Sequence, residues 1–333
     1  LGSTNSAGET NSINFSFLTS AGTVTLTSGG EFKNLTINGS GTTFNVNAQT
    51  IYGNYTWIAG TISNPPSLTM AATSGTKTIT TGGITHDATT INGVGGTFEL
   101  ADDITHNANQ PFTFINGTFD AKTFNVTASS MQSDYTNTRT LNMGSGTWTL
   151  DEGGGARASA QPWNINDGGT GLTLNKGTAN IVLSYNGAGA AEFYGGNKSY
   201  NNVTFSGSGT GLCRIYGSNT FGTVSIPNNR GKDLYLEAGS TNTFAGFDIS
   251  GENGDLMLLQ TTSSAGVQAT IAYSGTTKQT VTYALVKDII GYPAQTWYFT
   301  NSTDSGNNKD VYFYAAEPYF NAGNGPPTWL QFL

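Results

Sequence analysis

The residues best suited to chemistry gather between positions 86 and 120. This stretch holds both histidines of the chain, His86 and His106, and five acids, of which Asp102, Asp103 and Asp120 are the strongest candidates beside Asp87 and Glu99. Imidazole and carboxylate groups suit divalent ions, so the histidines and nearby acids are candidate metal ligands. Two carboxyl groups about 5 to 10 Å apart would instead suit glycoside hydrolysis, which makes the three aspartates candidate catalytic residues. The plainest interpretation is that all of these histidines and acids are turn and surface residues of a repeat.

The two histidines belong to a phrase that occurs twice. The sequence ITHD at residues 84–87 is followed twenty residues later by ITHN at residues 104–107. Side chains that recur at the length of one coil would stack on each other. The coil of about 30 residues that we derive below does not match this spacing, so we expect the histidines to lie out of register.

Aromatic side chains on an outer face would bind sugar rings. Tyr52 is one candidate, and Tyr194, Tyr200 and Tyr216 form a second group within a short stretch. We take these four tyrosines as candidate glycan-binding residues. Tyr55 and Trp57 share one face of a strand, and an inward orientation would make them core residues.

Other candidate sites are weaker. Residues 304–308 (DSGNN) supply oxygen atoms and a glycine turn, so Asp304 is a weak calcium candidate. The stretch lacks the full twelve-residue calcium loop, and an Asx turn explains it better. Cys213 is the only cysteine and occupies an inward position, which is typical of a small core residue. Phosphate loops, dinucleotide fingerprints, zinc cysteine pairs and nucleophile elbows are missing from the sequence, and we predict no cofactor.

The composition excludes several classes of protein. Charged residues make up 10% of the 333 positions and the net charge is −8, which gives no electrostatic basis for nucleic-acid binding. No run of about 18 apolar residues occurs, so we predict no membrane insertion. Aromatic residues reach 11%, and β-branched residues recur at strand spacing, which argues against a disordered chain.

Short strands must position these residues. In residues 32–46 (FKNLTINGSGTTFNV), apolar and small polar residues alternate on both sides of a small-residue turn, which is typical of half-buried strands. A similar phrase returns at residues 200–215 (YNNVTFSGSGTGLCRI). Further along, such pairs begin at positions 163, 172 and 181, and again at 203, 213, 224 and 234. Steps of nine to eleven residues suit either a sandwich or barrel, or a solenoid.

The length of the pattern favours the solenoid. It persists from Leu35 to Leu258, which is most of the chain, and its outward positions are repeatedly Thr, Asn and Ser. Three strands of about ten residues give a coil of roughly 30 residues. We therefore predict an all-β fold, a single-stranded parallel β-helix of roughly ten coils with an aromatic-rich C-terminal cap. Residues 1–22 would form a lead-in, residues 23–292 the β-helix, and residues 293–333 a cap or oligomer contact.

Two stretches resemble phage-encoded and metagenomic β-helical proteins. The first joins residues 117–128 (GTFDAKTFNVTA) to residues 137–150 (NTRTLNMGSGTWTL). The second joins residues 294–298 (AQTWY) to residues 301–308 (NSTDSGNN). In that group the second stretch ends in Gly-Trp, whereas here residues 309–312 (KDVY) and about twenty more residues follow. The resemblance implies a tail fibre, a tailspike, or a head fibre or decoration protein, often trimeric.

These observations lead to one functional hypothesis and three rivals. The first hypothesis is a non-enzymatic fibre, spike or decoration protein of a phage virion that presents a Thr/Asn-rich surface to a host glycan. Its expected partners are other copies in a trimer, other virion proteins and the glycan. A tailspike-like polysaccharide depolymerase using Asp102, Asp103 and Asp120 is the first rival. A secreted bacterial surface adhesin and a purely structural decoration protein are the others.

Overall fold

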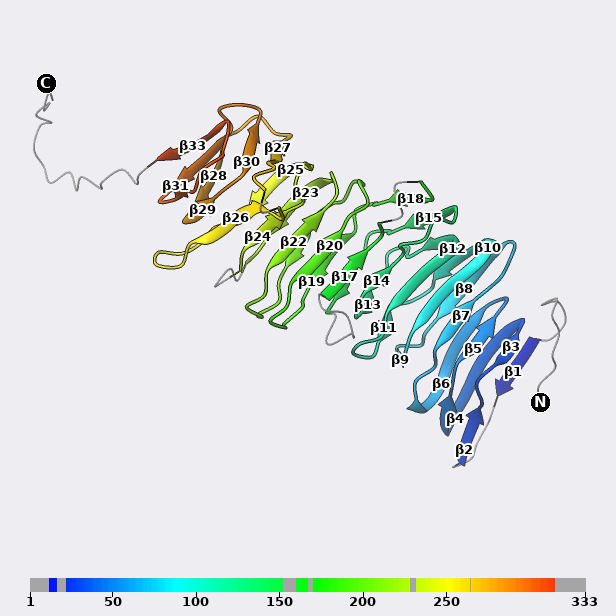
Figure 1. Ribbon diagram of the computed structural model, residues 1–333. Helices are drawn as coiled ribbons and strands as arrows, with labels where there is room; N and C mark the ends of the chain where they lie inside the picture. Colours follow the sequence, from blue (N-terminus) through cyan, green and yellow to red (C-terminus); the bar gives the residue numbers. More distant parts are fainter. Residues whose placement is uncertain are drawn as a thin grey trace, which may run out of the picture.

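The computed structural model describes residues 12–16, 22–151, 160–166, 170–227, 232–263 and 265–314. Within these ranges the chain has no helix, and parallel strands stack into an elongated β-solenoid of about 13 coils (Figure 1). Accordingly, none of the described residues forms a helix that is long and apolar enough to cross a membrane. At about 4.8 Å per coil, the stack is roughly 60 Å long. The predicted parallel β-helix is confirmed.

The strands belong to three hydrogen-bonded sheets of 20, 10 and 3 strands. The largest contains β1 (Ser12–Ser16), β2 (Gly22–Leu26), β3 (Gly30–Phe32), β4 (Asn34–Val46), β5 (Gln49–Ile51), β6 (Tyr55–Asn64), β7 (Leu68–Met70), β8 (Thr76–Thr80), β10 (Thr89–Leu100), β12 (Phe112–Asp120), β14 (Met131–Gln132), β15 (Arg139–Asn142), β17 (Ala160–Asn164), β18 (Leu172–Asn175), β20 (Ala191–Tyr194), β22 (Cys213–Tyr216), β24 (Leu234–Leu236), β26 (Met257–Thr261), β29 (Ala284–Val286) and β32 (Thr303–Asp304). The second contains β9 (Thr85–His86), β11 (Ile104–His106), β13 (Val126–Ala128), β16 (Thr147–Leu150), β19 (Asn180–Leu183), β21 (Val203–Phe205), β23 (Thr220–Ser225), β25 (Thr241–Asp248), β27 (Ala269–Tyr273) and β30 (Ile289–Tyr292). The third contains β28 (Gln279–Thr282), β31 (Trp297–Thr300) and β33 (Val311–Tyr314).

The coils are shorter than the sequence suggested. Between β21 and β23 the register partners Thr204 and Ser225 are 21 residues apart, and between β20 and β22 the partners Glu192 and Arg214 are 22 residues apart. Only one other strand, β20, lies between β19 and β21, so this coil has two strands rather than three. The coil is longer elsewhere, as between Trp148 and its partner Ile181.

Two numbers from the sequence analysis are therefore corrected. The predicted coil of about 30 residues was wrong for most of the stack, where register partners lie closer in sequence, as Gln49 and Leu68 do at 19 residues apart. It fits the middle of the stack, where Met131 and its partner Trp163 are 32 residues apart and β14, β15 and β16 make one coil of three strands. Shorter coils also mean more of them, so the count is about 13 rather than ten.

Alternating side chains build the core and the outer faces. In β4, Leu35, Ile37, Phe44 and Val46 are fully buried, while Thr36 and Asn45 beside them are partly exposed. Tyr55 and Trp57 are buried in the same way, as the inward alternative required. On the second sheet, the outward residues Thr85, Thr105, Thr127 and Thr149 stand in register on successive coils. Such alternation is expected where only one face of a strand is covered.

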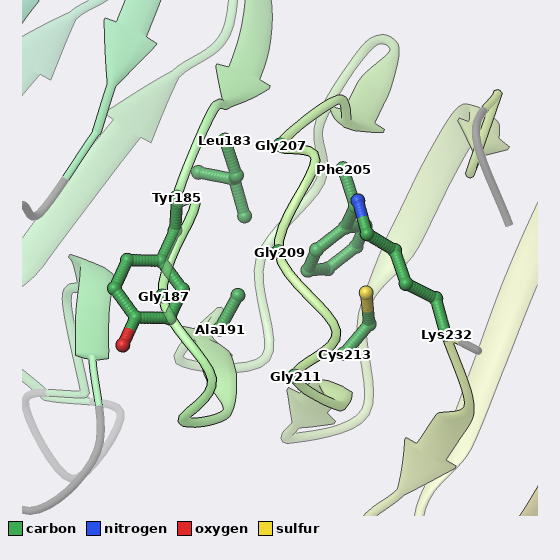
Figure 2. Close-up of a pocket in the computed structure, with 10 residues that line it drawn as sticks. All are labelled: Leu183, Tyr185, Gly187, Ala191, Phe205, Gly207, Gly209, Gly211, Cys213 and Lys232. Carbon is green, nitrogen blue, oxygen red and sulfur yellow. The ribbon is translucent and has the colours of Figure 1, made fainter. Parts of the chain in front are cut away.

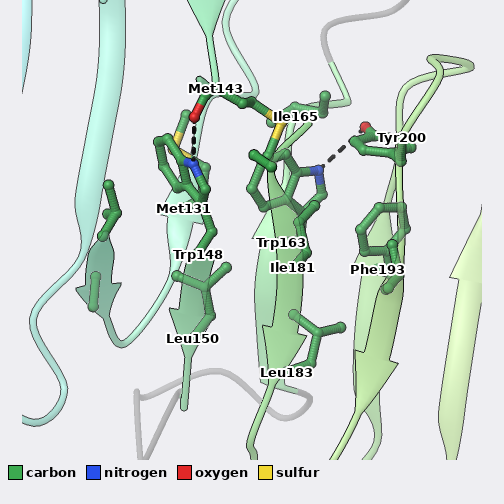
Figure 3. Packing of buried hydrophobic residues seen from close by; sticks show 14 of the residues in the cluster. Met131, Met143, Trp148, Leu150, Trp163, Ile165, Ile181, Leu183, Phe193 and Tyr200 are labelled. Carbon is green, nitrogen blue, oxygen red and sulfur yellow. Dashed lines mark hydrogen bonds between the residues drawn. The ribbon is translucent and has the colours of Figure 1, made fainter. Parts of the chain in front are cut away.

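Aromatic rings fill the middle of the solenoid. Trp148 and Trp163 are fully buried with their rings edge to face, 5.9 Å apart (Figure 3). Both indole N–H groups are paired inside the core. Trp148 Nε1 donates to the Met143 carbonyl, and Trp163 Nε1 donates to the Tyr200 hydroxyl; both distances are 3.2 Å. Such pairing is the rule for buried tryptophan, because an indole N–H left without a partner costs free energy.

The parallel stacking continues past both predicted boundaries. Strand β1 pairs with β4, although it lies in the predicted lead-in of residues 1–22. Beyond residue 292, β31 stacks on β28 and β33 stacks on β31. Residues 293–314 thus include coil strands, which carry the aromatic residues expected there. The rest of the predicted cap, residues 315–333, lies outside the described residues.

Close stacking of loops makes one glycine a sensitive position. A Cβ atom at Gly211 would collide with the carbonyl of Gly189 on the preceding coil. We expect Gly211→Ala to lower the free energy of unfolding by about 1 to 3 kcal/mol, because the backbone must shift to admit the methyl group. Denaturant unfolding would measure this. Gly22→Ala is the matched control, since a Cβ there has no atom within 4 Å. Equal midpoints for both variants would contradict the stacking of these loops.

Candidate functional site

Two outward tyrosines stack on neighbouring coils. Strands β20 and β22 pair in register, which places Tyr194 against Tyr216 and Glu192 against Arg214. The ring centroids of the two tyrosines lie 4.2 Å apart and their planes differ by 4°. They face outward because Phe193 and the other alternate residues of both strands are buried in the core.

A buried carboxylate organises this pair. Glu192 is only 3% exposed. It accepts a hydrogen bond from Arg214 Nη1 at 2.8 Å, from the Tyr194 hydroxyl at 3.1 Å and from the Tyr216 hydroxyl at 3.4 Å. Burial, and then the charge of Glu192, raise the pKa of both tyrosines above the usual range. Both hydroxyls therefore stay protonated and donate to the carboxylate, which fixes the rings in place.

A hollow of about 200 Å³ lies beside the tyrosine pair. It is lined from four successive coils, by Asn166, Tyr194, Gly196, Asn197, Tyr216, Gly217 and Glu237. Glu237 Oε2 accepts a hydrogen bond of 2.7 Å from the Gly217 amide. Asn197 Oδ1 accepts one of 2.6 Å from the Ser218 amide. We call these seven lining residues the tyrosine hollow. Its aromatic rings, amides and carboxylate suit a ligand that is rich in hydroxyl groups.

The other two tyrosine candidates lie elsewhere. Tyr200 is 1% exposed, and its hydroxyl donates to the Gly195 carbonyl at 2.7 Å inside the core. A glycan cannot reach it, so the structure removes Tyr200 from the outer site. The sequence grouped it with Tyr194 and Tyr216 because the strand alternation does not continue through the intervening turn. Tyr52 is partly exposed and follows β5, many coils from the hollow (Figure 1).

The two histidines stack inside the core. His86 and His106 pair in register, which corrects the expectation that they would lie out of register. The reason is the coil length, which matches their twenty-residue spacing. His86 Nε2 lies 3.1 Å from the Tyr55 hydroxyl, and His106 Nε2 lies 3.0 Å from Thr89 Oγ1. Among the described residues, no group of three His, Cys, Asp or Glu side chains is placed to hold a metal ion.

Burial keeps both imidazoles neutral. It lowers the pKa of His86 to about 4, with an opposing effect from the Ile84 backbone. Burial, and then a charge on His86, lower the pKa of His106 to about 3 against the opposing effect of the Gln110 and Pro111 backbone. Neutral rings are consistent with a role in core packing.

Asp102 and Asp103 each accept hydrogen bonds from a neighbouring coil. Asp102 accepts hydrogen bonds of 2.7 Å from the amides of Thr81 and Gly82. Asp103 accepts bonds from the amide and the side chain of Asn125, at 2.8 and 3.0 Å. Adjacent in sequence, the two carboxylates thus fasten different coils, one before and one after their own.

Asp120 faces an acid that the sequence did not single out as its partner. Its register partner across β10 and β12 is Glu99. Lys122 bridges the two, with Nζ 2.8 Å from Glu99 and 3.4 Å from Asp120. The spacing of the two acids in the sequence equals one coil, which is the signal that would have paired them. This ion pair is exposed and therefore of small energetic weight.

Asp304 forms the expected Asx turn. Its Oδ1 accepts hydrogen bonds from the Gly306 amide at 2.8 Å and from Asn308 Nδ2 at 2.6 Å. Both donors come from its own loop, as the local interpretation required.

A second cavity is too small for a ligand. It has a volume of about 10 Å³, enough for one water molecule at most. Figure 2 shows Tyr185 and Lys232 on opposite sides of the loop that carries Gly207 and Gly209. Cys213 lines this cavity, is 2% exposed, and has a pKa raised to about 12 by burial. It is a protonated core residue, as predicted.

The polar residues around Tyr194 and Tyr216 were not predicted from the sequence. Glu192, Arg214, Asn166, Asn197 and Glu237 were not among the candidates. A signal was present, because the triplets EFY, RIY and YLE begin at residues 192, 214 and 235, about one coil apart. Each has an apolar centre between two outward residues, so the outer residues form columns.

Comparison with known proteins adds no relative. No family model matches the chain, and neither does any curated protein or solved structure.

Proposed function

We propose that this chain is a non-enzymatic fibre, spike or decoration protein of a phage virion that binds a host glycan through the tyrosine hollow. The observation that carries the glycan proposal is the stacked pair Tyr194 and Tyr216 beside a hollow lined by amides and a carboxylate. A rigid outer aromatic pair binds a sugar at low entropic cost, because its own conformation is already fixed.

The rod shape supports a role in display. Each coil contacts its neighbours, and a core of fully buried residues such as Phe44, Phe119 and Phe193 runs through the stack. Such a rod would hold a binding site at a set distance from its base. Assembly into a trimer would place three sites side by side. Once one site has bound the glycan, the other two bind at a high effective concentration, which raises the overall affinity. The virion location rests on the sequence resemblance described above.

The placement of the acids favours binding over cleavage. Asp102 and Asp103 accept hydrogen bonds from neighbouring coils, and Asp120 is paired with Lys122. A glycosidase needs two carboxyl groups free to face the substrate on either side of the bond. In the proposal these acids hold the solenoid together instead.

Binding without cleavage is the expected result when the protein meets its glycan. Purified protein would be mixed with surface polysaccharide from candidate host cells, and both co-sedimentation and reducing-end release would be measured. We expect co-sedimentation that decreases at least about tenfold in Tyr194→Ala/Tyr216→Ala, with reducing ends at the level of the protein-free control. Reducing-end release that disappears in Asp120→Asn would establish the depolymerase instead. Electron microscopy of virions would test the location.

A further inference from the structure

The tyrosine hollow has an uneven distribution of charge. Glu192 accepts hydrogen bonds from both tyrosine hydroxyls and lies 2.8 Å from Arg214 Nη1, so the charges of Glu192 and Arg214 compensate each other. Of the described residues that line the hollow itself, only Glu237 carries a charge. A ligand in the hollow therefore meets one uncompensated negative charge, which repels uronic and sialic acids and accepts neutral sugars.

Glu237 is also held in a fixed position. Its Oε2 accepts the Gly217 amide proton at 2.7 Å, while its Oε1 receives no hydrogen bond from the described residues. The backbone bond leaves one carboxylate oxygen free to accept hydrogen bonds from a ligand. A carboxylate oxygen has room for two such bonds, which matches two neighbouring hydroxyl groups of a sugar.

Donors face the same space. Asn197 lines the hollow and uses its Oδ1 to accept the Ser218 amide proton, so its Nδ2 group remains as a donor. Asn166 also lines the hollow, from the coil that precedes that of Tyr194. A sugar hydroxyl both donates and accepts, so it can bond to an amide and to the carboxylate together. The hollow, at about 200 Å³, suits a single sugar ring.

We propose that Glu237 makes the tyrosine hollow selective for a neutral saccharide unit, by accepting hydrogen bonds from adjacent hydroxyl groups and repelling acidic sugars. This inference rests on the proposed function, and it adds the class of ligand and the residue that selects it.

The test compares neutral and acidic probes on the full chain. Ligand-observed NMR titrations would use hexasaccharides of glucose, galactose and mannose as neutral probes, with hexagalacturonate and sialyllactose as acidic probes. We expect wild type to bind at least one neutral probe and to bind the acidic probes at least about tenfold more weakly. In Glu237→Gln, neutral affinity should fall about threefold to tenfold while acidic affinity rises. Opposite shifts in one variant cannot result from misfolding.

Control variants separate the two proposals. Tyr216→Ala should abolish neutral binding, whereas Tyr312→Ala, in the second stack of tyrosines with Tyr298, should leave it unchanged. Neutral binding that is lost in Tyr216→Ala but unaltered in Glu237→Gln would overturn the role of Glu237 and leave glycan binding in place. A preference of the wild type for acidic probes would overturn it as well. If none of the probes binds, the result contradicts both the proposed function and this inference.

Discussion

Replacing Arg139 by methionine is expected to lower the free energy of unfolding by at least about 3 kcal/mol. Arg139 is 2% exposed and lies among the loop residues that precede it. Its Nη1 donates to the carbonyls of Tyr135 and Asn137 at 2.6 and 2.7 Å, Nε donates to Ser133 Oγ at 2.7 Å, and Nη2 donates to the Ser133 carbonyl. The carbonyl of buried Ser133 costs about 1 to 3 kcal/mol when it is left without a donor, and methionine supplies none. The carbonyls of Tyr135 and Asn137 are more exposed, so losing their bonds to Arg139 costs less.

Guanidinium suits this position because of its geometry. Residues 133–138 form no strand, so their carbonyl groups lack the ladder partners that strands provide. Arginine offers five N–H donors in a planar fork and reaches several carbonyls at once. Denaturant unfolding would measure the effect, with Lys122→Met as the control for loss of an exposed positive charge. If both variants unfold at the wild-type midpoint, Arg139 does not hold this loop.

Acid should weaken the solenoid through its two buried histidines. The pKa values of His86 and His106 in the folded chain are about 4 and about 3, below the value of about 6.5 expected for an unfolded chain. Below pH 6.5 the unfolded chain therefore binds more protons than the folded chain. The contribution of the two histidines to the free energy of unfolding is fully present above pH 6.5 and decreases as the pH drops. It becomes constant only below their pKa values in the folded chain. Between pH 6.5 and 4 the loss should reach about 3 kcal/mol for each histidine.

The histidine contribution can be separated from that of the carboxylates. His86→Gln/His106→Gln keeps a hydrogen-bonding nitrogen near each Nε2 position but does not titrate in this range. Urea unfolding at pH 7, 5.5 and 4 should show a smaller loss of stability in this variant than in wild type. The acids are the same in both proteins, so their effect cancels in the difference. Parallel pH curves for the two proteins would show that the buried imidazoles do not control acid stability.

The fold was predictable because its strongest signal is local. In β4 and in the strands around Val203, every second residue is apolar, and that period alone indicates half-buried strands. The coil length was harder to predict. Strands at steps of about ten residues fit two or three strands per coil equally well. Only hydrogen bonding between coils decides, as in the pairing of Ile181 with Val203.

The candidate site was predictable only in part, for the same reason. Tyr194 and Tyr216 were identified by residue type, but Glu192 and Glu237 join them only when the coil has the shorter length that the register of β20 and β22 shows. The error at Tyr200 has a different cause. It follows a turn, where the period of two is lost and the direction of a side chain depends on turn geometry. With the correct coil length, the spacing of His86 and His106 predicts their stacking directly.

Four of the five tryptophans lie at different heights along the rod. Trp57 lies near the amino end, Trp148 and Trp163 lie in the middle, and Trp297 lies near the carboxyl end, all of them buried. In a stack where each coil contacts only its neighbours, loss of structure starts at an end and advances coil by coil. The fluorescence of each tryptophan then reports when that advance reaches its own level. In variants that retain a single one of these indoles, fluorescence would report how far along the solenoid the unfolding has advanced.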